Sequence, residues 1–155
     1  DKVFVPFSGG SAGFMDFLGK ELQPFVDAHY RTSGVRTVIG QSLGGLLATE
    51  VLFKHPQLFD DYIIVSPSVW WDSGSLAATA ETWAMANGKL PKRVFLAMAS
   101  NDDWSQAQVD HMVKVFGTRT AAPFQWWYVP FPQETHATVL HRAVYRAFEV
   151  MNAPK

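Results

Sequence analysis

Residues 38–47 read Val-Ile-Gly-Gln-Ser-Leu-Gly-Gly-Leu-Leu, a β-branched pair followed by the pattern Gly-x-Ser-x-Gly and then by apolar residues at helical spacing. This order predicts a strand, a sharp turn and a helix, with Ser42 exposed on the turn as a nucleophile. We expect Gly40 and Gly44 where a Cβ would meet the neighbouring strand or helix. The N–H of Leu43 lies in the first helical turn, where donors are unpaired, so it is expected to bind an oxyanion.

A tight turn with an idle serine is the alternative interpretation of the same pattern. The surrounding sequence favours the nucleophile, because residues 36–39 are typical of a strand and the apolar spacing after the motif is typical of a helix.

Apolar periodicity predicts a strand and a helix in alternation along the rest of the chain. The expected strands are 61–65, 94–98 and 124–129, and the expected helices are 14–30, 43–54, 76–87, 105–116 and 137–151. Pro24 is expected to disturb the first helix, and Gly117 is expected to end the fourth. This alternation predicts an α/β fold with a mostly parallel sheet flanked by helices, forming a single catalytic domain over residues 1–155.

The carboxyl ends of parallel strands meet at one edge of a sheet, because crossovers are right-handed. Ser42, the Asp102-Asp103 pair and His136 all follow predicted strands, so they are expected to converge there. Their chain order, Ser, Asp, His, is the order found in α/β-hydrolases. His136 is the candidate general base, oriented by a carboxylate. Asp103 is favoured for that carboxylate, and Asp102 remains an alternative.

Two adjacent indoles, Trp70 and Trp71, also follow a predicted strand, where ligands bind in open α/β sheets. Pocket lining and core packing are equally weighted explanations for them, because an indole suits both. Together with Gln41, which precedes the nucleophile, they are the candidate substrate-binding residues.

Composition and motif spacing exclude several other classes of function. The net charge is −1 and no Lys/Arg stripe is present, which argues against nucleic acid as a partner. No apolar run is long enough for a membrane span. His136 and His141 lack the i, i+4 spacing of a zinc helix, and the chain has no cysteine. We therefore expect no metal, no cofactor and a small-molecule ester as the substrate, in either a cytoplasmic or a periplasmic setting.

Three segments carry a family resemblance: residues 40–46, residues 66–72 (Ser-Pro-Ser-Val-Trp-Trp-Asp) and residues 134–139. They resemble the putative esterase (esterase D-like) family of α/β-hydrolases, and within it the siderophore esterases that cleave enterobactin-type trilactones. The resemblance implies a serine esterase that uses Ser42 and His136, with Asp103 as the acid or with a Ser-His dyad. It also implies an aromatic acyl or catecholate pocket at Trp70 and Trp71.

Two other functions remain open at this point. An acyltransferase could use the same acyl-enzyme, since an alcohol or thiol can intercept it in place of water. A non-catalytic binding module or an inactive fragment could keep the scaffold alone.

The chain departs from the family in the length that precedes the nucleophile. The resemblance covers nearly the whole chain, from Gly9-Gly10 through His136, but members of the family have further early strands and a loop that supplies a second oxyanion N–H. Only about 40 residues precede Ser42 here. We expect a missing N-terminal segment or a second chain to complete the sheet. The strand that carries Ser42 would otherwise be an exposed apolar edge, so the chain alone is expected to be poorly soluble or oligomeric.

Overall fold

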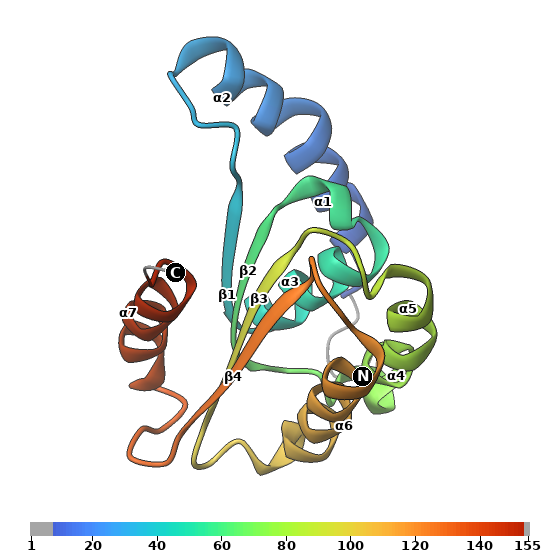
Figure 1. Cartoon of the computed structure of the whole chain (residues 1–155), viewed down its shortest axis with the longest axis vertical. Helices are drawn as coiled ribbons and strands as arrows, with labels where there is room; N and C mark the ends of the chain where they lie inside the picture. The colour runs from blue at the N-terminus through green and yellow to red at the C-terminus, as the bar shows by residue number, and fades with distance from the viewer. Residues whose placement is uncertain (1–7, 154–155) are drawn as a thin grey trace.

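A computed structural model describes residues 8–153, so part of the proposed 1–155 domain lies outside the described residues. Four strands form one sheet in the order β1 (Thr37–Ser42), β2 (Asp61–Pro67), β3 (Arg93–Ala99) and β4 (Gln125–Phe131). All three pairings are parallel (Figure 1). The predicted parallel sheet is therefore confirmed, and the carboxyl ends of all four strands lie at the same edge.

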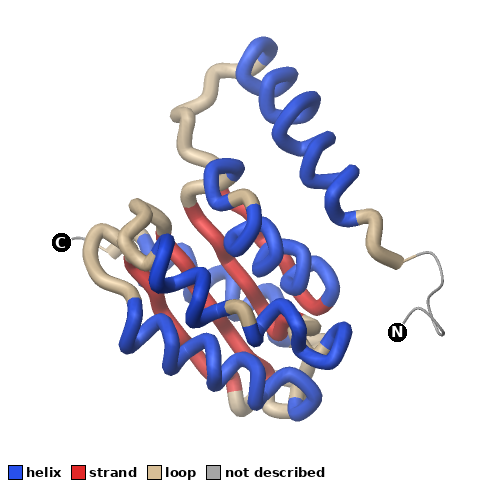
Figure 2. The backbone as a smooth tube through the Cα atoms, turned by 90° about the vertical axis from the view of Figure 1, so that its right-hand side faces the viewer, coloured by secondary structure: helices blue, strands red, loops and turns tan. Residues whose placement is uncertain are grey.

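Helices cover both faces of this sheet unequally. The helices of the described chain are α1 (Ser11–Phe17), the π-helical turn η1 (Leu18–Leu22), α2 (Gln23–His29), α3 (Leu43–Lys54), α4 (Ser75–Ala78), α5 (Ala80–Asn87), α6 (Asp103–Arg119) and α7 (Val139–Met151). Two 3-10 turns, η2 (Pro56–Leu58) and η3 (Trp71–Gly74), complete the set. In Figures 1 and 2, α3, α5 and α6 lie on one face of the sheet and α7 lies on the other.

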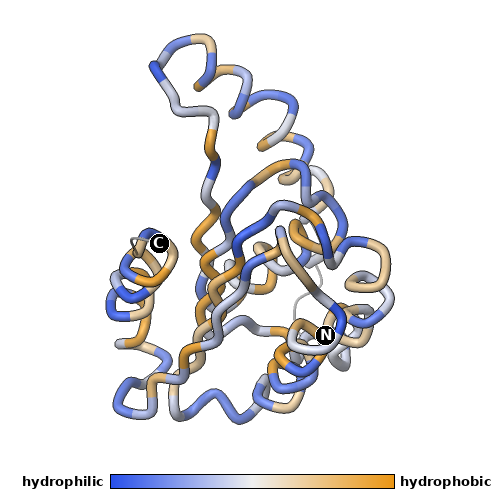
Figure 3. The backbone as a smooth tube through the Cα atoms, in the orientation of Figure 1, coloured by the Kyte–Doolittle hydropathy of each residue, from blue (hydrophilic) through white to orange (hydrophobic). Residues whose placement is uncertain are grey.

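The core is centred on β2 and β3, whose residues are almost all buried. Neighbouring residues on these strands belong to separate apolar clusters, because successive side chains of a strand point to opposite faces. Ile64 and Leu96 pack in the cluster beneath α3, α5 and α6, whereas Ile63 and Phe95 pack against α7. Figure 3 shows the apolar residues concentrated along these central strands. Such continuous apolar runs are typical of parallel strands that are covered on both faces.

β1 is an edge strand of the described sheet, since β2 is its only partner there. Its Ile39 side chain is 44% exposed. The long helix from α1 to α2 projects away from the sheet (Figures 1 and 2) and also exposes apolar side chains, among them Phe14, Phe17 and Phe25. The expected exposed apolar edge is thus present beside the strand that carries Ser42.

Three helices differ in detail from the prediction. The first begins at Ser11 and contains the π-helical turn η1 shortly before Pro24, a residue with no N–H to donate. The helix expected at 76–87 is broken at Thr79, whose hydroxyl donates to the Leu76 carbonyl at 2.7 Å. The prediction that Gly117 ends a helix is wrong, because α6 continues to Arg119. A Cβ on Gly117 would lie 3.6 Å from Trp126, which is an ordinary contact distance, so the packing leaves room for a Cβ at this position.

Buried polar groups at the amino ends of the strands tie the layers together. Asp61 of β2 accepts a hydrogen bond from Arg93 Nε of β3 at 2.7 Å, and Arg93 also donates to the Met151 carbonyl of α7 at 2.8 Å. The hydrogen bond to Asp61 raises the pKa of the Arg93 guanidinium. Burial raises the pKa of the Tyr62 hydroxyl, which donates to the Pro56 carbonyl at 3.3 Å.

Candidate active site

Ser42 ends β1 in a strained backbone conformation, with φ 59° and ψ −122°, and α3 begins at the next residue. Non-glycine residues rarely adopt a positive φ, and such strain concentrates at functional sites. The pairing of β1 with β2 shifts register between Gln41 and Ser42, which marks the point where the chain leaves the sheet. The predicted strand, sharp turn and helix are all present, and they place Ser42 at the carboxyl edge of the sheet.

Two of the three glycines around Ser42, Gly40 and Gly45, have no room for a Cβ, whereas Gly44 does. A Cβ on Gly40 would lie 2.1 Å from the Gly44 carbonyl oxygen, a distance that no structure tolerates. A Cβ on Gly45 would lie 2.9 Å from Pro67 Cα. No described atom lies within 4 Å of a Cβ built on Gly44, so the expectation of a close contact at Gly44 is wrong. The helix approaches β2 through Gly45 instead.

The segment after β2 brings a second serine close to Ser42. Ser66 has φ 41°, and its hydroxyl accepts a hydrogen bond from the Ala99 N–H at 3.0 Å. This bond joins the ends of β2 and β3 while the chain turns. Ser68 then donates its N–H to the Ser42 carbonyl at 3.0 Å, and the hydroxyl oxygens of Ser42 and Ser68 lie 3.3 Å apart. Ser42 is therefore held by both its backbone and its side chain.

His136 is held at three points by residues from two strand ends. Its Nδ1 lies 2.7 Å from Asp102 Oδ1, and its backbone N–H donates to Asn101 Oδ1 at 2.8 Å. The amide Nε2 of Gln41 donates to its carbonyl oxygen. Because a carboxylate can only accept, the Asp102 contact favours the tautomer that carries its proton on Nδ1 and has Nε2 as the acceptor. That tautomer is the one a general base requires.

The carboxylate beside His136 belongs to Asp102, and the expectation of Asp103 is corrected by this contact. Asp103 is the first residue of α6 and is exposed, where its charge faces the positive end of the helix. Asp102 precedes the helix, and its side chain is only 10% exposed. The buried hydroxyl of Ser105 donates to the Pro67 carbonyl at 2.7 Å, which fixes this loop to the end of β2. The second oxygen of Asp102, Oδ2, is buried and has no hydrogen-bond partner among the described residues.

No hydrogen bond joins Ser42 to His136 within the part of the chain that the structure describes. Ser68 connects the two residues: its hydroxyl lies 3.3 Å from that of Ser42, and it lines a small cleft together with His136. Contacts between a nucleophile and its base are often long when no substrate is bound. This cleft has a volume of about 100 Å³.

The candidate substrate-binding residues have different environments. Trp70 lines the small cleft, whereas Trp71 opens the turn η3 and lines a large groove; their ring centroids lie 5.7 Å apart. Both indoles are partly exposed, which favours pocket lining over core packing. Gln41 was expected to contact substrate, but its side-chain amide is bonded to the His136 backbone. The structure thus gives Gln41 a role in holding the backbone of His136.

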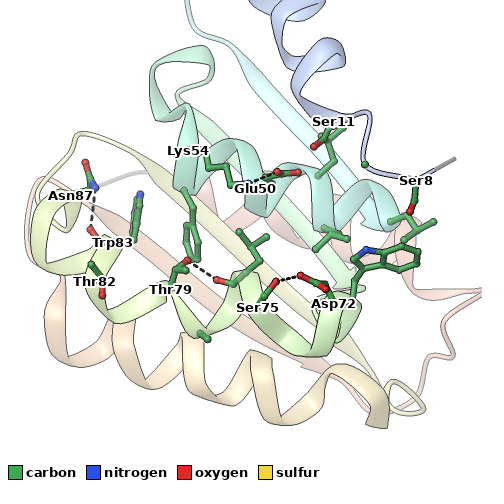
Figure 4. A pocket seen from close by; sticks show the side chains of 18 of the residues that line it. Ser8, Ser11, Glu50, Lys54, Asp72, Ser75, Thr79, Thr82, Trp83 and Asn87 are labelled. Atoms are coloured by element: carbon green, nitrogen blue, oxygen red, sulfur yellow. Dashed lines mark hydrogen bonds and ion pairs between the residues drawn. The ribbon is translucent and has the colours of Figure 1, made fainter. Parts of the chain in front are cut away.

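The large groove runs along α3 and has a volume of about 1450 Å³ (Figure 4). Leu43, beside the nucleophile, lines it, and Asn87 of α5 also belongs to its wall. Its apolar lining comes from Leu46, Leu47, Phe53, Leu76 and Trp83. Some of the polar side chains in Figure 4 pair with one another or with the backbone, as Lys54 does with Glu50 at 2.7 Å. The groove therefore offers an apolar surface that extends from the position of Ser42.

Sequence reasoning did not assign roles to Ser68, Asn101 and Trp104. Each lies within a polar or aromatic segment that follows a strand, and that position was the available signal. Which of several adjacent polar residues faces the histidine depends on the turn geometry, which the pattern does not specify.

The structure adds two observations about other classes of site. Across residues 8–153, no cluster of three or more His, Asp or Glu side chains is positioned to hold a metal ion. None of the described helices has the length and hydropathy needed to cross a membrane.

Similar proteins share both the sequence and the fold. The chain is 38% identical over 104 residues to the siderophore triacetylfusarinine C esterase of Aspergillus fumigatus, a match that covers 63% of this chain and 34% of that protein. It is 28% identical over 149 residues to the ferri-bacillibactin esterase BesA of Bacillus subtilis, covering 92% of this chain and 52% of that protein.

A crystal structure of an IroE-like serine hydrolase from Shewanella oneidensis superimposes with a TM-score of 0.81 at 28% identity, covering 92% of this chain and 48% of that one. The chain thus spans about a third to a half of the length of these relatives. The family model described as "Putative esterase" matches residues 2–137. With its parallel sheet and its siderophore-esterase relatives, this chain belongs to the Putative esterase family and has an α/β-hydrolase fold.

Proposed function

We propose that this chain carries the nucleophile and the base of a serine carboxylic-ester hydrolase. One observation supports the proposal most strongly: a histidine ring fixed by a buried carboxylate lies at the same sheet edge as a serine with strained backbone geometry. Family membership and the esterase relatives support the same class of reaction.

In the proposed acylation step, Ser42 Oγ attacks the carbonyl carbon of the ester and His136 Nε2 takes the hydroxyl proton. The carbonyl oxygen becomes an oxyanion, which the N–H of Leu43 binds at the start of α3. The bond to the alcohol then breaks, and His136 returns the proton to the departing oxygen. Water then attacks the acyl carbon of the acyl-enzyme while His136 takes a proton from it. The bond to Ser42 Oγ breaks, His136 returns the proton to this oxygen, and the acid is released.

Asp102 acts on the ring of His136 in both steps. It accepts the Nδ1 hydrogen bond, which keeps Nε2 directed at the reacting groups and stabilises the imidazolium that forms. In the absence of substrate, the Ser42 hydroxyl has Ser68 as its polar neighbour. The Ser42 hydroxyl must therefore rotate away from Ser68 before it can donate its proton to His136 Nε2.

Siderophore-type or aromatic esters are the proposed substrates. Two similar proteins bear names that state siderophore ester cleavage, one for triacetylfusarinine C and one for bacillibactin. The partly exposed Trp70 and Trp71 offer indole surfaces beside the proposed nucleophile, which suit a flat ring. The large groove beyond Leu43 supplies apolar surface for the acyl part of such an ester.

Covalent labelling tests the proposal directly. The full chain is exposed to an alkyl fluorophosphonate, and its intact mass is measured for the wild type, Ser42→Ala and Ser68→Ala. We expect one label per chain in the wild type and in Ser68→Ala, and none in Ser42→Ala. A folded wild-type chain that takes up no label, or a Ser42→Ala chain that keeps it, would contradict the proposed nucleophile.

A further inference from the structure

Trp104, the second residue of α6, is unusually exposed for a tryptophan. Its exposed fraction is 76%, and its ring contacts only Trp70 among the aromatic rings that the structure describes. The two centroids lie 5.7 Å apart at an interplanar angle of 69°. An edge-to-face contact of this kind occupies at most one face of either ring. At least one face of Trp104 is therefore open to a further flat partner.

Trp104 lies beside the proposed base and not on a remote surface. It lines the small cleft together with Trp70, Asp102 and His136. Asp102, two residues before Trp104 in the chain, is the residue that holds the histidine ring. A group bound in this cleft thus contacts both an indole and the imidazole.

The position beside His136 identifies which part of an ester would occupy the cleft. When Ser42 Oγ bonds to the acyl carbon, the bond between that carbon and the alcohol oxygen breaks. His136 then transfers to this oxygen the proton taken from Ser42, so it must lie within hydrogen-bond reach of it. The departing alcohol therefore lies on the His136 side. The large groove, lined by Leu43 and Trp71, is left for the acyl part.

We propose that Trp104, supported by Trp70, is a specificity-determining residue that binds an aromatic ring on the alcohol part of the ester. The inference rests on the proposed ester hydrolysis and adds the chemical class and the side of the substrate. An aliphatic ring of the same size gains apolar contact from Trp104 but lacks the aromatic pairing that an indole face favours. The expected preference is thus for flat rings over saturated rings, on the alcohol side only.

Matched esters separate this preference from general hydrophobicity. We compare kcat/KM for benzyl acetate and cyclohexylmethyl acetate in the full chain and in Trp104→Leu, which keeps an apolar side chain without the aromatic face. We expect kcat/KM for benzyl acetate to fall about 3- to 10-fold, as the loss of one aromatic pair implies. The value for cyclohexylmethyl acetate should change less than about 2-fold, which is below the effect expected for the loss of an aromatic pair.

Three controls locate the effect. Ethyl phenylacetate and ethyl cyclohexylacetate carry the same rings on the acyl side, and their ratio should not change in Trp104→Leu. Tyr145→Leu removes another exposed aromatic residue, on α7, and should leave all four esters unaffected. The rate of deacylation after a single turnover of benzyl acetate should also be unchanged, since the alcohol has already left.

The outcomes distinguish this inference from the proposed function. An equal loss for benzyl and cyclohexylmethyl esters, or a loss confined to the acyl-side pair, would overturn the role of Trp104 while ester hydrolysis stands. A wild-type chain that hydrolyses none of the four esters and takes up no fluorophosphonate would overturn both.

Discussion

His136 Nδ1 and Asp102 Oδ1 lie 2.7 Å apart, and this contact joins the loop after β4 to the loop after β3. The Asp102 side chain is nearly buried, whereas the His136 side chain is 41% exposed. The carboxylate is thus shielded from water while the base remains accessible to a substrate. A fixed anion behind an accessible imidazole is the arrangement that general-base catalysis by a serine esterase requires.

Asp102→Asn and Asp103→Asn form a matched pair that tests this contact. An amide at position 102 can donate to Nδ1 and thereby favour the wrong tautomer, so we expect kcat to fall about 10³- to 10⁴-fold. Asp103→Asn should change kcat by less than about 3-fold, a limit set by its helix-end interaction alone. Steady-state kinetics on one ester measures both. A larger loss in Asp103→Asn than in Asp102→Asn would contradict the assignment.

Gln41→Leu tests whether the nucleophile strand also positions the base. The substitution removes the amide that donates to the His136 carbonyl while keeping a side chain of similar size. We expect kcat to fall about 10-fold with little change in KM, because the missing bond misplaces the base and not the substrate. Gln41→Glu, which lacks the donor, should behave like Leu. A rise in KM at constant kcat would indicate instead that Gln41 contacts substrate.

Gly40→Ala and Gly44→Ala each add one methyl group to the chain, but the two variants should differ sharply in stability. The new methyl group at Gly40 would lie 2.1 Å from a backbone oxygen, so we expect a loss of about 3 kcal/mol or more in the free energy of unfolding. The methyl group at Gly44 meets no described atom, and a helical Gly→Ala change is neutral or stabilising by up to about 1 kcal/mol. Urea denaturation of both variants measures the difference, and equal stabilities would refute the close approach of α3 to β1.

Tyr62 gives the stability of the fold a dependence on alkaline pH. Burial raises the pKa of its hydroxyl above the ordinary value of about 10, so the folded chain keeps the proton after the unfolded chain has lost it. This contribution is fully present below pH 10 and is lost as the pH rises further, by up to about 1.4 kcal/mol per pH unit. Tyr62→Phe should therefore reduce the fall in unfolding free energy between pH 9.5 and 11, whereas the exposed Tyr145→Phe should leave the slope unchanged.

The exposed apolar face of α1 and α2, together with the β1 edge, predicts self-association of the chain when it is studied alone. Phe14 and Phe25 are both about half exposed on this helix. We expect the sedimentation coefficient to rise with concentration, and the double variant Phe14→Gln, Phe25→Gln to reduce that rise. A wild-type chain that remains monomeric at every concentration would contradict the expectation.

The sequence allowed the sheet, its parallel sense and the nucleophile turn to be predicted, because long apolar runs and Gly-x-Ser-x-Gly act through local geometry. The choice between Asp102 and Asp103 could not be predicted. Adjacent residues at a helix start point in different directions, and only the cap geometry at Asp102 directs its carboxylate to His136. The helix end predicted at Gly117 was also wrong. A glycine commonly ends a helix, but α6 continues through Gly117 to Arg119.

The groups proposed for catalysis follow the order of synthesis along the sheet, since β1 ends at Ser42, β3 leads to Asp102, and His136 comes after β4. Chains begin to fold from their N-terminal part while translation continues. A nascent chain would thus complete its nucleophile turn long before the histidine leaves the ribosome. The serine would remain chemically inert until the last strand has docked, which links the onset of reactivity to the completion of the sheet.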